Sequence, residues 1–168
     1  MAPSSSKKKA FEAYLKKLKD PDPETRKRAA RDLAYLDDAR AVPHLIDVLS
    51  DKDKKVRWRA AYALGHFGET GSEEAFKALA SQLEIEPDWN VRRIIVMTFR
   101  HWGKMPIEPL IRALEDESPY VRRYAAMTLG LKKFREAIEP LKKLLEKEES
   151  KEVRDYAGWA IEKIKKDL

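Results

Sequence analysis

Apolar residues along the chain recur three and four positions apart, which is the spacing that places them on one face of an α-helix. Two kinds of segment show this pattern, and they alternate. Short amphipathic segments, such as AVPHLIDVL at 41–49 and PIEPLIRAL at 106–114, precede segments built around Val-Arg, such as VRWRAAYALG at 56–65. The pattern predicts ten helices in five pairs and gives no indication of strands.

The Val-Arg segments repeat along the chain with a period of about 31 residues. One arginine anchors each repeat, and a small or aliphatic pair follows it three and four residues later. An acidic residue stands six positions before every anchor. The anchors are Arg26, Arg57, Arg92, Arg122 and Arg154, and the acids are Asp20, Asp51, Glu86, Asp116 and Glu148. Because regular repetition follows packing more than ligand chemistry, we interpret these ten residues as a structural ladder of ion pairs.

The motif V-R-x-x-A-A-x-A-L-G, with its preceding acid, stands almost unchanged at 51–65 and 116–130. It resembles the HEAT repeat of the subtype named for phycobilisome lyases. This resemblance implies an all-α fold, an α-solenoid in which about five HEAT-like helix pairs form a right-handed superhelix, with the Val-Arg helices on its concave side. We expect a disordered basic tail at 1–7 and a single domain at 8–168, with units near 8–36, 39–67, 72–102, 105–132 and 135–166.

Positions one, five and nine after each anchor follow one another along the helix side opposite the core, with position two beside them. Of these twenty residues, seven are basic and one is acidic, an excess as large as the formal charge of the whole chain, +6. Aromatic residues and arginine are also frequent anchors of binding. We therefore predict a partner-binding face that contains Arg31, Trp58, Arg59, Tyr62, His66, Arg93, Met97, His101, Arg123, Tyr124, Met127 and Trp159.

A packing role is the alternative for this face. Tryptophan, methionine and tyrosine at helical spacing often belong to a core, and rows of arginine are often only solvated. Trp89 and Trp102 lie outside the chosen positions, and we interpret both as packing or loop-covering residues. In the third repeat Ile95 and Val96 replace the alanine pair, so the helices there are expected to be spread or kinked.

The chain carries little that points to chemistry. It has no cysteine, which excludes disulfides, thiolate metal sites and cysteine nucleophiles. His66 and His101 share position nine of neighbouring repeats, but no third ligand is apparent. HEAT-fold deoxyhypusine hydroxylases carry His-Glu dyads, whereas Leu45, Phe67 and Trp102 follow the three histidines here. We expect no enzyme activity, no catalytic residue, no metal and no other cofactor.

The leading functional hypothesis is a non-enzymatic binding or scaffold module that grips an acidic or amphipathic protein segment on the basic and aromatic concave face. The second is a nucleic-acid-binding protein that uses the same face for phosphate contacts and base stacking. The third is an engineered repeat scaffold without a natural ligand. With many Lys, Glu and Arg, only Gln82 and Asn90 as amides, and no apolar run long enough to span a membrane, we expect a thermostable, cytoplasmic monomer.

Overall fold

The computed structural model describes residues 5–68, 70, 72–103 and 105–166. Regular structure in these residues consists of ten α-helices and two short 3-10 helices, without a strand. The predicted all-α fold is therefore confirmed. The predicted tail is partly wrong, because the first helix begins at Ser5 and takes in residues 5–7, whereas residues 1–4 lie outside the described part.

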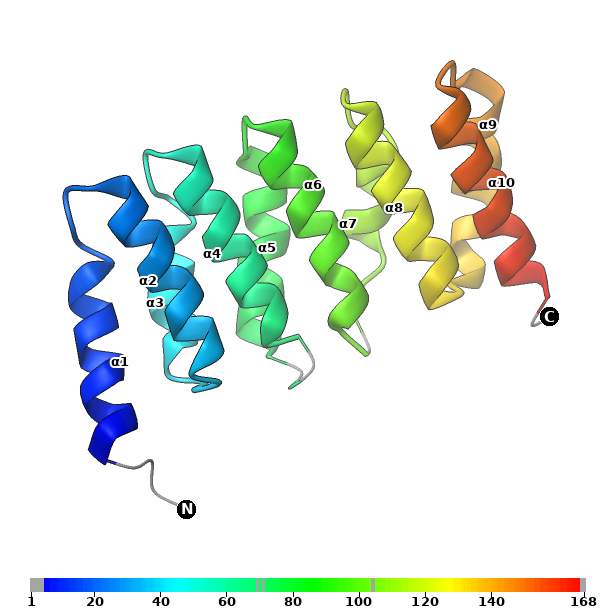
Figure 1. Ribbon diagram of the computed structural model, residues 1–168. Coiled ribbons are helices and arrows are strands. Elements are labelled where there is room, and N and C mark those ends of the chain that lie inside the picture. Colours follow the sequence, from blue (N-terminus) through cyan, green and yellow to red (C-terminus); the bar gives the residue numbers. More distant parts are fainter. Residues whose placement is uncertain (1–4, 69, 71, 104, 167–168) are drawn as a thin grey trace.

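The helices form two layers that run the length of the stack (Figure 1). One layer holds the Val-Arg helices α2 (Pro23–Tyr35), α4 (Lys54–His66), α6 (Trp89–Thr98), α8 (Pro119–Lys132) and α10 (Lys151–Lys165). The helices that precede them are α1 (Ser5–Lys17), α3 (Ala41–Val48), α5 (Glu73–Ile85), α7 (Glu108–Ala113) and α9 (Ile138–Lys147), and the 3-10 helices are η1 (Phe99–His101) and η2 (Arg135–Ala137). The two chain ends lie at opposite ends of the stack (Figure 1).

Neighbouring Val-Arg helices pack against one another along the whole stack, whereas α3, α5, α7 and α9 contact one another sparsely. In a curved stack of helix pairs, the helices on the concave side lie closer together than those on the convex side. The arrangement is that of an α-solenoid, in which each unit packs on its neighbours, as the sequence predicts.

The anchor arginines and their acids form the predicted ladder between repeats. Each of the first four anchors donates from Nε and Nη2 to the acid of the following repeat, at 2.6–3.0 Å. Its Nη1 donates to two backbone carbonyls in the loop before its own helix, as Arg122 does to Asp116 and Glu117. Arg154 keeps the two carbonyl bonds but has no carboxylate partner among the described residues. The ladder therefore fixes each loop to the next one along the stack.

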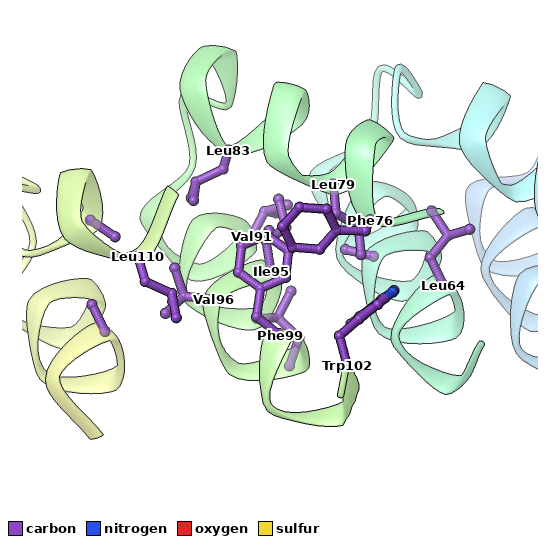
Figure 2. Packing of buried hydrophobic residues seen from close by; sticks show 14 of the residues in the cluster. Leu64, Phe76, Leu79, Leu83, Val91, Ile95, Val96, Phe99, Trp102 and Leu110 are labelled. Atoms are coloured by element: carbon purple, nitrogen blue, oxygen red, sulfur yellow. The ribbon is translucent and has the colours of Figure 1, made fainter. Parts of the chain in front are cut away.

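The third repeat ends differently from the others. Helix α6 stops at Thr98 and continues as η1, and the rings of Phe76, Phe99 and Trp102 pack together with centroids 5.0–6.2 Å apart (Figure 2). Trp102 is buried and its Nε1 donates to the Ser72 carbonyl at 3.1 Å. The prediction that Trp102 is a packing residue is confirmed.

Candidate binding face

All twelve side chains of the predicted face lie on the Val-Arg helices or η1, and none of them is fully buried. Arg31, Tyr62, His66 and Trp159 are exposed, and the other eight are half-buried. Trp58, Met97 and Tyr124 also pack one side of the side chain against the core. These residues thus reach solvent, and the outward side of the Val-Arg helices is called the Val-Arg face below.

One position assigned to the face is buried, and one residue assigned outside it is more exposed than expected. Ile94, at position two of the third repeat, is 2% exposed and belongs to the core. Trp89, expected to pack or cover a loop, is 43% exposed and stacks on Tyr120 at a centroid distance of 4.9 Å. Trp89 precedes Arg93 by one helical turn, and Tyr120 precedes Tyr124 by one turn. Extending the chosen positions one turn towards the helix start would have found both residues.

On α4, the side chains of Trp58, Arg59 and Tyr62 stack on one another. The rings of Trp58 and Tyr62, one turn apart, are 5.6 Å from centroid to centroid and 2° from parallel. The Arg59 guanidinium lies 5.0 Å from the Trp58 centroid and 5.7 Å from that of Tyr62, within the range of a cation–π contact. Trp58 Nε1 and Arg59 Nε are shielded from solvent and have no hydrogen-bond partner.

A second cluster crosses α6, α8 and α10. The Arg93 guanidinium lies 5.4 Å from the Tyr124 centroid, and that of Arg123 lies 5.0 Å from Tyr124 and 5.8 Å from Tyr156. In both α6–α8 and α8–α10, the arginine at position one of one helix therefore covers the tyrosine at position two of the next. Tyr156 meets Trp159 edge to face at 6.4 Å. The row of rings and guanidinium groups continues across three helices.

Acidic neighbours neutralise many cations of the Val-Arg face. Lys27 pairs with Glu24 at 2.6 Å, Arg31 with Asp32 at 2.8 Å, Lys54 with Asp88 at 2.8 Å and Arg123 with Glu152 at 2.6 Å. These acids stand at helix starts or between the counted positions. Counting the face positions alone therefore overstates the positive charge of this surface.

A groove of about 460 Å³ opens on this face where α4 and α6 begin. Tryptophans from both helices line it, with cationic side chains from α2 and α4 around them. The lining residues are Lys27, Lys54, Lys55, Trp58, Arg59, Asp88, Trp89, Asn90 and Val91. Because Lys54 pairs with Asp88, whose carboxylate also caps α6, the acid in this lining is already neutralised.

The two histidines of the face occupy different settings. His66 Nε2 lies 3.6 Å from Asp37 Oδ1, and both side chains are largely exposed. His101 lies in η1 and accepts a hydrogen bond from Arg100 Nε at 3.3 Å, because α6 ends before position nine. Within the described residues, no three histidine, aspartate or glutamate side chains are placed to hold a metal ion.

Comparison with known proteins identifies the repeat. A family model described as HEAT repeats matches residues 11–100 and 107–167. A HEAT repeat-containing taxis protein of Halobacterium salinarum is 32% identical over 157 residues, which cover 91% of this chain and 34% of that protein. The chain thus spans about a third of the length of this curated relative.

Solved structures show the same fold at lower identity. The complex of CpcE and CpcF of phycocyanin lyase from Nostoc matches 93% of this chain and 65% of that chain, with a TM-score of 0.73 and 22% identity. A designed armadillo repeat protein in complex with the peptide (KR)4 matches 97% of this chain and 87% of that chain, with a TM-score of 0.65 and 18% identity. Among the described residues, no helix has the length and apolar character needed to cross a membrane.

Proposed function

This chain belongs to the HEAT repeat family, and we propose that it is a non-enzymatic binding module that holds an acidic or amphipathic segment of a partner protein on its Val-Arg face. The observation that carries the proposal is the row of exposed and half-buried aromatic rings, with arginine guanidinium groups over them, that crosses several repeats. The segment would lie across the helices and contact several units at once.

The aromatic side chains supply the apolar part of such an interface. Tyr62, Trp89, Tyr120, Tyr156 and Trp159 are each between 38% and 48% exposed, and all of them stand on Val-Arg helices. Large rings that are held by their neighbours but open to solvent lose little conformational freedom on binding. Aromatic residues and arginine are also the side chains most often found at the energetic centre of protein interfaces.

The charge distribution favours a short acidic segment over a nucleic acid. A duplex presents a dense row of phosphates, and its affinity depends on many cations that are free to neutralise them. On the Val-Arg face Lys27, Lys54 and Arg123 already have carboxylate partners. Only a few cations of the face therefore remain to bind a ligand, and they stand at separate places. A protein segment with a few carboxylates matches this distribution better than a continuous row of phosphates does.

A related fold supports a peptide ligand. The designed armadillo repeat protein carries the basic peptide (KR)4 on a stack of comparable architecture. The free cations of the Val-Arg face indicate the opposite preference here.

Selection from a random peptide library on the immobilised protein tests the proposal. We expect enriched peptides to combine Asp or Glu with large apolar residues. Arg93→Ala and Tyr62→Ala should weaken their binding at least about tenfold, as for interface anchors, without lowering the melting temperature by more than a few degrees. Ile85→Ala is the matched control, because Ile85 is 74% exposed but stands on α5 in the other layer.

Two results would overturn the proposal. One is peptide binding that Ile85→Ala weakens and the two face variants leave unchanged. The other is tight binding of duplex DNA, without peptide binding, that falls about 500-fold between 50 and 200 mM salt, as about five phosphate contacts imply.

A further inference from the structure

We propose that the groove where α4 and α6 begin is the acid-recognition subsite of the Val-Arg face, and that Arg59 is the arm that takes the carboxylate. The inference rests on the proposed function, since the carboxylate is that of an Asp or Glu in the bound segment. In this subsite Arg59 leaves its stack on Trp58 and turns towards the ligand, so that Arg59 and the Trp58 indole N–H both donate to the carboxylate oxygens.

Among the arginines that lie over aromatic rings of this face in the described residues, Arg59 is the one without a polar partner. Three arginines lie over aromatic rings of the Val-Arg face in the described residues. Arg93 donates to Asn90 Oδ1 at 2.8 and 3.0 Å, and Arg123 pairs with Glu152 at 2.6 Å. Arg59 has neither an ion pair nor a hydrogen bond in this part of the chain, and its Nε is shielded and unsatisfied. Its guanidinium therefore keeps its full capacity to bind an oxyanion.

The Trp58 indole N–H is a second donor at the same place. It is also shielded and without a partner, and the Arg59 guanidinium lies over the Trp58 ring. A cation–π contact is weaker than a pair of charge-assisted hydrogen bonds to a carboxylate, so a carboxylate can draw Arg59 away from the Trp58 ring. Moving Arg59 to a carboxylate would give both unsatisfied donors an acceptor. A ligand with an oxyanion is therefore favoured here, because it accepts hydrogen bonds from two N–H groups that have no acceptor in the free protein.

The rest of the lining defines the chemistry of the ligand. Lys27 and Lys54 are already paired, with Glu24 and Asp88, whereas Lys55 has no carboxylate partner in the described residues. Arg59 and Lys55 therefore give the groove two uncompensated positive charges and no uncompensated negative one. Trp58 and Trp89 provide apolar walls from two helices. The ligand that fits is an Asp or Glu next to a large apolar residue.

Isotope-detected NMR of the tryptophan indole N–H groups tests the subsite directly. The probe is a capped octapeptide that alternates glutamate and phenylalanine, and its glutamine counterpart is the uncharged control. We expect the glutamate peptide to shift the Trp58 indole resonance and to leave that of buried Trp102 in place. The glutamine peptide should bind at least about tenfold more weakly, since a charge-assisted hydrogen bond is lost.

Conservative variants separate the two donors from the ring stack. Trp58→Phe keeps an aromatic ring but removes the N–H, and Arg59→Lys keeps the charge but removes Nε. Each variant should bind the glutamate peptide about tenfold more weakly than the parent protein does. This affinity equals the one expected for the parent protein and the glutamine peptide. Tyr14→Phe, on α1 and outside the Val-Arg face, keeps its ring and is the matched control, with unchanged affinity expected. Melting temperatures of all three variants should stay close to that of the parent protein, because none removes a satisfied buried group.

The outcomes distinguish this inference from the proposed function. If the glutamate peptide binds but Trp58→Phe and Arg59→Lys bind it like the parent protein, the subsite is wrong and the binding face stands. If inorganic phosphate shifts the Trp58 resonance as strongly as the peptide does at equal concentration, recognition of a protein carboxylate is wrong. If the peptide neither binds nor shifts any indole resonance, the acidic-segment function fails together with its subsite.

Discussion

Arg57 donates from Nε and Nη2 to the two carboxylate oxygens of Glu86, at 2.9 and 2.7 Å, although Glu86 lies 29 residues further along the chain. The Glu86 side chain is completely enclosed and that of Arg57 is 12% exposed. Gln82 Nε2 and the Asp88 backbone N–H also donate to the same carboxylate. The charge of Glu86 is thus removed from water and depends on one arginine from the preceding repeat.

Arg57→Met should destabilise the protein by about 3–5 kcal/mol, because it leaves the buried Glu86 carboxylate without a counterion. Arg154→Met is the matched control, since Arg154 stands at the same repeat position without a carboxylate partner in the described residues and donates only to two carbonyls. It should cost about 1 kcal/mol. Urea unfolding followed by circular dichroism gives both values, and equal costs would show that the ladder carries no ion-pair stabilisation.

The ladder should also make the protein sensitive to acid. Hydrogen bonds from Arg122 lower the pKa of Glu148 below its ordinary value of 4.5, against the opposing effect of burial. Burial raises the pKa of Asp51, but the hydrogen bonds from Arg26 and a backbone N–H outweigh it, and the net direction is down. A carboxyl with a lower pKa in the folded state stabilises the fold above its unfolded pKa, and this contribution is lost as the pH falls through the folded value.

We therefore expect the melting temperature to fall steeply once the pH drops below about 4.5, the ordinary value for glutamate. Glu148→Gln should lower the melting temperature at pH 7, because Arg122 loses its counterion, and should make the decline in acid shallower. Calorimetric scans of both proteins between neutral pH and about pH 2 measure the two slopes. Parallel curves for the two proteins would contradict a lowered pKa for Glu148.

Two glycines test how closely the Val-Arg helices approach. A Cβ at Gly130 in α8 would lie 2.8 Å from the Ala160 Cα and 2.8 Å from the Trp159 ring, so α8 and α10 would have to move apart. Gly130→Ala should cost about 1–3 kcal/mol. A Cβ at Gly158 in α10 would meet nothing within 4 Å, and Gly158→Ala should stabilise the helix by about 0.5–1 kcal/mol. The same sign for both variants in urea unfolding would contradict this packing.

Regular features of this fold could be predicted from the sequence, because each repeats the same physical requirement. The recurring acid and arginine predicted a ladder of ion pairs, but left open whether each pair lies within a repeat or between repeats, as Arg26 and Asp51 do. Helical geometry placed Tyr62 and Trp159 at the surface. The charge of the face could not be predicted in the same way. Whether Arg123 meets Glu152 depends on how two helices align and which rotamers they allow, and neither is encoded in the repeat spacing.

The misassigned residues have separate physical causes. Trp89 lies on the same side of α6 as Arg93 but one turn before position one, where the repeated pattern does not extend. The side chain at position two faces the preceding repeat. How far it is buried therefore depends on which side chains of that repeat lie against it. Arg59 stays half-buried over rings of its own helix, whereas Ile94 packs into the core. The same repeat position can therefore be surface in one unit and core in the next.

This difference within one repeat position gives a last prediction. Ile94→Ala should destabilise the protein by about 2–5 kcal/mol, since it removes a fully packed side chain and leaves a cavity in the core. Arg59→Ala, at the same position of the preceding repeat, removes only cation–π contacts with Trp58 and Tyr62 and should cost about 0.5–1 kcal/mol. Thermal and urea unfolding of the two variants measure the contrast. A large loss for Arg59→Ala would mean that its stack is a structural element and not an arm available to a ligand.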